Sequence, residues 1–187
     1  MKRIFRMILP VLALVPCAMA QQPGLSADWD IRAILKEISA HAGRLVPLLD
    51  QADPSAWVQK GAPDAYIVQW KSLKEQAQAL SGDALELSKD PEKLAPALQT
   101  FFRMQSIEFM VGSYAEGMRR YQNPAQANQL IALAAENGAN RGRFQHYIVE
   151  LAAQKEQEYQ IMDHEAQRCR GMPSREAPAS KGKTGRR

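Results

Sequence analysis

Apolar residues recur every three or four positions along most of this chain, which is the period of an amphipathic α-helix. No segment alternates apolar and polar residues over the length of a β-strand. Three dipeptides divide the pattern: Asp53-Pro54, Asp90-Pro91 and Asn123-Pro124. Each places a capping side chain before a proline at the first helical position. The pattern therefore predicts an all-α protein folded as an antiparallel four-helix bundle.

The first three helices are expected at residues 28–50, 64–88 and 91–121, the third beginning at Pro91 or Ala95. Pro47 lies inside the first and removes one backbone hydrogen bond, which favours a kink near Gly43. Residues 51–63 form a long connection with room for one helical turn. The apolar stripe of the third helix is broadened by three further side chains: Phe102, Ile107 and Phe109.

The fourth helix is expected to run from Pro124 to Cys169. A continuous helix of about 46 residues would measure about 69 Å, which is long for this domain. Glycines and asparagines at 137–142 make a kink there as reasonable as continuity. Helix 3 can match it only to about residue 153, so residues 155–169 should project past the bundle. That segment is highly charged and keeps a thin stripe of Tyr159, Met162, Ala166 and Cys169.

Three ionisable residues occupy positions that their helix stripes would otherwise give to apolar side chains: His41, Glu108 and Arg141. Counting outward from each turn brings all three to about the same height in an antiparallel bundle, with Asn137 one turn from Arg141. Because buried charges are costly unless paired, we expect a central polar layer in which Glu108 and Arg141 pair. Its role is either structural, fixing helix register, or that of a site for a metal, haem or small polar ligand.

The first twenty residues have the three-part form of a secretory signal peptide. Basic residues precede an apolar run from Met7 to Cys17, and small residues at Ala18 and Ala20 suit a signal peptidase. A membrane anchor would need about 20 apolar residues, and this run is shorter and contains prolines. We therefore expect residues 1–20 to be cleaved, leaving a secreted or periplasmic domain at 21–170 and no transmembrane segment.

Charge is concentrated at the two ends of the chain. The formal net charge of +4 includes three basic residues in the expected signal, and residues 171–187 carry five more against one acid. The remaining body is slightly acidic, so overall basicity gives no support for nucleic-acid binding. The tail 171–187 is rich in Pro, Gly, Ser, Lys and Arg and is expected to be disordered.

One of the two cysteines, Cys17, would leave with the signal. The mature chain then holds only Cys169, which cannot form an intramolecular disulfide. A lone cysteine in an exported protein is compatible with an intermolecular bond. Residues 155–169 are therefore either a solvated helix end packed by Leu25 and Trp29 or a docking or homodimer seam, with Cys169 able to cross-link two copies.

Catalytic and cofactor motifs are absent from the sequence. It contains no Cys-x-x-Cys-His, no Glu-x-x-His pair, no His-Glu-x-x-His, no phosphate-binding glycine loop and no Gly-x-Ser-x-Gly. We therefore expect no enzyme activity, no metal and no cofactor. The hypothesis that follows is an exported, non-catalytic bundle that binds or scaffolds a protein of the cell envelope. The alternative is a bundle that binds a metal, haem or small polar ligand at the central polar layer.

Overall fold

The structure, a computed structural model, describes residues 28–171 and is helical almost throughout, with no strand in that range. The expected signal segment 1–20 and residues 172–187 of the expected tail lie outside the described residues. The helices are α1 (Asp28–Leu49), α2 (Pro54–Gln59), α3 (Ala65–Leu87), α4 (Leu94–Tyr121), α5 (Pro124–Glu136) and α6 (Gly138–Gly171). The predicted all-α class is confirmed.

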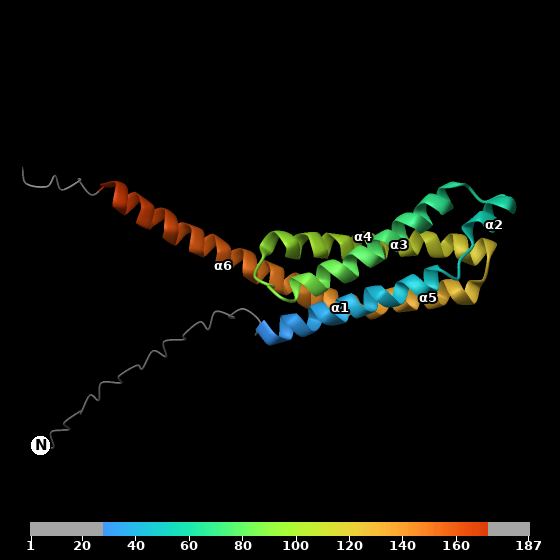
Figure 1. The fold of residues 1–187 in the computed structure, drawn as a ribbon, viewed down its shortest axis with the longest axis horizontal. Helices are drawn as coiled ribbons and strands as arrows, with labels where there is room; N and C mark the ends of the chain where they lie inside the picture. The colour runs from blue at the N-terminus through green and yellow to red at the C-terminus, as the bar shows by residue number, and fades with distance from the viewer. Residues whose placement is uncertain (1–27, 172–187) are drawn as a thin grey trace, which may run out of the picture.

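The helices form an antiparallel four-helix bundle (Figure 1). Helix α1 packs against α3, α3 packs against α4, and α4 packs against α5 and α6. The ring closes because α5 and α6 also contact α1. Together α5 and α6 occupy the place of the predicted fourth helix. The short α2 is the single turn expected in the long connection, and it lies beside α3.

Two of the three predicted start signals work as expected. The Asp53 carboxylate accepts the Ala56 backbone N–H at 3.0 Å before α2, and the Asn123 side chain accepts that of Ala125 at 2.9 Å before α5. The Asp90-Pro91 pair does not start a helix. Helix α4 begins at Leu94 instead, after Lys93 in extended backbone. Asp90 forms an ion pair with Lys93 at 3.0 Å in that connection.

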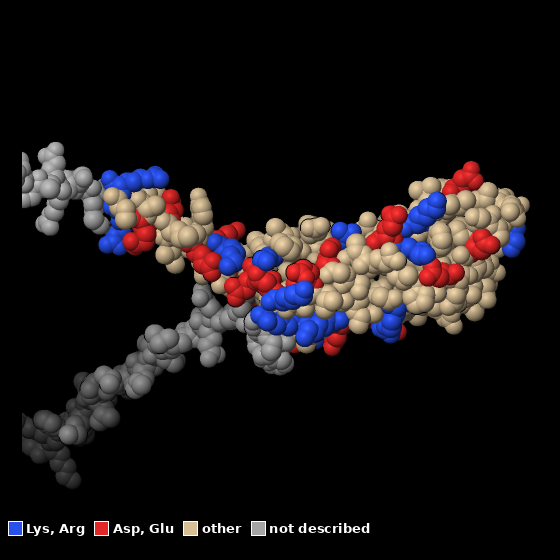
Figure 2. All heavy atoms as spheres, in the orientation of Figure 1, with Lys and Arg blue, Asp and Glu red and all other residues tan. Residues whose placement is uncertain are grey.

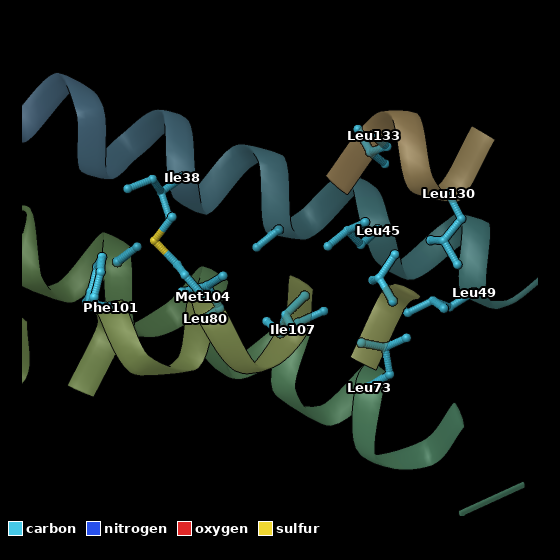
Figure 3. Close-up of a cluster of buried hydrophobic side chains, with 14 of the residues drawn as sticks. Ile38, Leu45, Leu49, Leu73, Leu80, Phe101, Met104, Ile107, Leu130 and Leu133 are labelled. Atoms are coloured by element: carbon cyan, nitrogen blue, oxygen red, sulfur yellow. The ribbon is translucent and has the colours of Figure 1, made fainter. Parts of the chain in front are cut away.

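A cluster of buried apolar side chains runs along the bundle axis and draws on all six helices. Figure 3 shows the part of it that α1, α3, α4 and α5 contribute. Most predicted stripe positions lie in this cluster. The predicted broadening of the third helix is wrong for Phe102 and Phe109, which are 60 % and 82 % exposed. They lie seven residues apart, on the outward face of α4. Tyr114 on α4 and Tyr147 on α6 are buried instead.

The long fourth helix is broken at Asn137, within the range where a kink was expected. Its backbone N–H bonds the Ala135 carbonyl at the end of α5, and its own carbonyl accepts the Arg141 N–H at 2.9 Å in the first turn of α6. One residue therefore ends one helix and starts the next.

Helix α6 leaves the bundle after its last buried side chain, Leu151, and continues to Gly171 (Figure 1). We call residues 155–170 the α6 extension. From Tyr159 to Arg170 every side chain is exposed, and the surface is strongly charged (Figure 2). The predicted projection past the bundle is confirmed. Among the described helices, none combines the length and apolar character needed to cross a bilayer.

Candidate functional site

His41 lies on α1 with only 6 % of its surface exposed. Its Nε2 bonds the backbone carbonyl of Leu133, in the last turn of α5. Because that carbonyl oxygen can only accept, Nε2 carries the hydrogen. The histidine therefore ties α1 to the helix end that the break at Asn137 creates.

The pKa of His41 is lowered from its usual value of 6.5. Burial is the largest cause, since it penalises the charged imidazolium, and the Arg44 guanidinium acts in the same direction. The bond to Leu133 and the carboxylates of Glu136 and Glu108 oppose the shift but do not cancel it. The imidazole is consequently held in its neutral form near pH 7.

The Glu108 carboxylate on α4 accepts a hydrogen bond from Nη1 of Arg141 on α6. The expected contact between these two side chains is present. Their location differs from the expectation, because the side chains are 27 % and 40 % exposed and lie at the edge of the bundle. The charges remain partly solvated there, so the pair contributes less to stability than a buried pair could.

Asn137 is 6 % exposed, and its side-chain oxygen has no hydrogen-bond partner among the described residues. It lines a cavity of about 10 Å³ together with His41, Glu108 and the apolar side chains of Leu80 and Met104. A cavity of this size holds about one water molecule. The polar layer therefore brings His41, Asn137 and Glu108 to one cavity, while Arg141 approaches from its outer side.

The layer offers little space for a cofactor. Lys74, which is at the same height in sequence counting, pairs with Asp50 and stacks over the Trp70 ring at 4.7 Å. Within the described residues, no three metal-ligating side chains gather in one place. A haem or a small organic ligand would have to displace the packed side chains around His41.

A larger groove, of about 360 Å³, lies on the outer side of the same region. The Glu108–Arg141 pair forms its polar wall. Its remaining lining is apolar or small and comes from α4, α5 and the start of α6: Val111, Gly112, Ile131, Ala134, Ala135 and Gly138. The sequence analysis missed this groove because it forms between helices, at the break.

Phe109 directly follows Glu108 on α4 and is 82 % exposed, and Phe102 lies two turns away on the same face. We call Phe102, Phe109 and the groove the α4 face. Large aromatic side chains at this exposure beside a small-residue groove are unusual on a solvated helix. The helical periodicity predicted that both phenylalanines belong to the buried stripe of α4, whereas both lie on its solvent-exposed face.

A second group of residues, at the α2 end of the bundle, is structural. The rings of Trp57, Tyr66 and Tyr114 pack together with centroids 5.1 to 6.5 Å apart. Gln122 accepts the Trp57 indole N–H at 2.8 Å and donates to the Gln51 carbonyl at 3.0 Å. Burial raises the pKa of the Tyr114 hydroxyl, which keeps it protonated. This cluster fixes α2 against α3 and α4.

Cys169 is exposed near the end of the α6 extension. His164 is exposed on the same helix, five residues before it. Neither residue contributes to the polar layer or to the α4 face.

Comparison with known protein families, characterised proteins and solved structures gives no match to this chain.

Proposed function

We propose that this protein is an exported, non-catalytic helical bundle that binds or scaffolds a protein partner in the cell envelope. The observation that carries the proposal is the α4 face. Phe109 and Phe102 stand out into solvent on α4, the helix whose Glu108, Val111 and Gly112 form one wall of a groove of about 360 Å³ lined mainly by small and apolar side chains. Exposed aromatic anchors next to a groove are typical of protein-binding surfaces.

The partner that fits this surface presents an apolar side chain to the groove and a polar group to its wall. Gly112 and Gly138 have no neighbouring atom within 4 Å of where a Cβ would stand, so a partner's backbone can approach closely. Glu108 and Arg141 remain partly exposed and can exchange hydrogen bonds with that partner. The geometry supports binding rather than bond-making chemistry, since no nucleophile with an adjacent base lines the groove.

The export part of the proposal is supported by residues 1–20, which have the three-part form of a secretory signal peptide. The alternative, a ligand at the central polar layer, is supported by the unpartnered Asn137 oxygen and the buried His41. A cavity of about 10 Å³ limits that ligand to the size of a water molecule unless the bundle opens.

The test is photo-crosslinking in the cells that make the protein. Phe109 is replaced by a photoreactive phenylalanine analogue, and the same analogue replaces Val68 as the control, because Val68 is 69 % exposed on α3. We expect an adduct in the envelope fraction from position 109 only. Mass spectrometry of that adduct should show that the chain carrying the analogue begins at Gln21. Equal adducts at both positions, or none at 109, would contradict the proposal.

A further inference from the structure

The α6 extension carries an apolar stripe that the described part of the chain leaves exposed. Tyr159, Met162, Ala166 and Cys169 continue the face on which Ile148 and Leu151 enter the core. Tyr159 and Met162 are 68 % and 63 % exposed. A helix of this length gains little stability in water from intrinsic propensity alone, so a second surface against the stripe would stabilise it.

The charges of the extension are divided along its length. Residues 156–165 contain four acids and no lysine or arginine, whereas residues 166–170 contain Arg168 and Arg170. Two such helices placed parallel would align acid with acid and arginine with arginine. Placed antiparallel, the basic end of each helix lies against the acidic segment of the other, which is favourable.

The length of the extension fits the antiparallel arrangement. Pairing centred on Met162 puts Cys169 opposite Lys155 and brings Arg170 to within two residues, about 3 Å along the axis, of the height of Glu156. At that height the extension meets the bundle in a groove of about 450 Å³. Its lining comes from α4 and α6: Leu94, Ala152, Lys155, Glu156, Tyr159 and Gln160. The end of one helix would therefore fill the groove of the other copy.

We infer that two copies of this chain associate antiparallel through their α6 extensions. The dimer contact contains no residue of the α4 face. It is therefore separate from the proposed binding of a partner there. In this arrangement the two Cys169 residues lie about 21 Å apart along the axis, fourteen residues at 1.5 Å each. A disulfide requires Cα atoms within about 7 Å, so the cross-link between two Cys169 residues expected from sequence does not form within this dimer.

The first test is sedimentation equilibrium of the purified full chain. We expect a reversible dimer that weakens as salt is raised, because solvent-exposed charges are screened. Glu156→Arg and Arg170→Glu should each raise the dissociation constant about three- to tenfold, and the double variant should restore it. A monomer at every concentration overturns the inference, and so does a double variant weaker than both single ones.

The second test is disulfide trapping, which separates the two orientations. Lys155→Cys, in the chain that keeps Cys169, should give a covalent dimer on oxidation because the two cysteines face each other. The unsubstituted chain should stay monomeric on a non-reducing gel. Efficient cross-linking through Cys169 alone would show parallel helices and overturn the inference. Phe109→Ser should leave dimerisation unchanged, because Phe109 lies outside the α6 extension. Loss of partner binding at the α4 face and loss of the dimer can therefore be told apart.

Discussion

At the scale of single residues, Gly117 on α4 shows how closely the aromatic cluster is packed. A Cβ at this position would stand 2.4 Å from Cε1 of the Tyr66 ring. That ring is held between Trp57, Tyr114 and Tyr121, with centroids 5.8 to 6.5 Å away. Glycine is therefore required here because a side chain would not fit. Its backbone conformation is that of an ordinary α-helix, which any residue can adopt.

Gly117→Ala should destabilise the protein. Overpacking a core costs about 1–3 kcal/mol, which more than offsets the about 0.5–1 kcal/mol that alanine gains over glycine within a helix. The measurement is the free energy of unfolding in urea. Gly112→Ala on the same helix is the control, because no atom lies within 4 Å of its Cβ position, and it should stabilise by about 0.5–1 kcal/mol. Equal effects at the two positions would contradict the packing argument.

His41 should make stability depend on pH. Its pKa is lower in the folded state than the usual 6.5, so the unfolded chain binds more protons between those two values. The contribution of neutral His41 to the free energy of unfolding is fully present above pH 6.5. It is lost as the pH falls through the folded-state pKa. The free energy of unfolding should therefore decrease on acidification in this window, before the carboxylates titrate.

The comparison that isolates His41 uses two substitutions. His41→Gln should flatten the dependence of unfolding free energy on pH immediately below pH 6.5. His164→Gln should retain it, because His164 is exposed on the α6 extension and is solvated in both states. A decline that persists in His41→Gln would show that another group causes it.

At the scale of elements, α6 is divided between a packed half and a projecting half. The packed half buries Phe144, Tyr147, Ile148 and Leu151. In the α6 extension the exposed side chains are joined along the helix by local pairs such as Gln167 with Asp163 at 2.7 Å and Arg168 with Glu165 at 3.0 Å. Such pairs add only a few tenths of a kcal/mol each.

Ending the chain after Glu158 should leave the bundle intact. Among the removed residues, those whose burial the structure describes, 159–170, are all exposed, so the unfolding free energy of the monomer should change by less than about 0.5 kcal/mol. Urea unfolding at low protein concentration measures this. Ending the chain after Gln145 is the contrasting variant, since it removes Tyr147, Ile148 and Leu151 and should abolish cooperative unfolding. A large loss in the first variant would mean that the extension packs on the bundle.

The elements and their order could be predicted from sequence because helical periodicity and proline caps are local signals. The contact between Glu108 and Arg141 could also be predicted, because hairpin counting needs only turn positions and the rise per residue. The orientation of α4 could not be assigned fully. Phe101 and Phe102 are adjacent and equally apolar, and only packing against Phe144 decides that the first is buried.

The partner of His41 was also beyond sequence reasoning. It is a backbone carbonyl, which carries no side-chain signature, and it becomes available at a helix end produced by the break at Asn137. The same break creates the groove on the α4 face. Features of the site that depend on where two helices meet therefore had to come from the structure.

At the scale of the whole molecule, the bundle places its features at different heights. The aromatic cluster lies at the α2 end, and the extension leaves from the opposite end of the bundle (Figure 1). The polar cavity and the groove of the α4 face lie near the α5–α6 break. On the face shown in Figure 2, acidic and basic side chains are interspersed. The positive balance of the full chain thus belongs to its ends, as the sequence indicates.

The projection of α6 also has a mechanical consequence. From Leu151, where burial stops, about 28 Å of helix extends outward to Arg170, against about 20 Å inward to Gly138. A sideways force on the free arm acts as torque about Leu151, with the longer arm outside. The reaction is taken up by the packing of Ile148 and Phe144 and, at the inner end, by the Asn137 junction. Load applied at the end of α6 would thus be transmitted to the region where His41 holds α5.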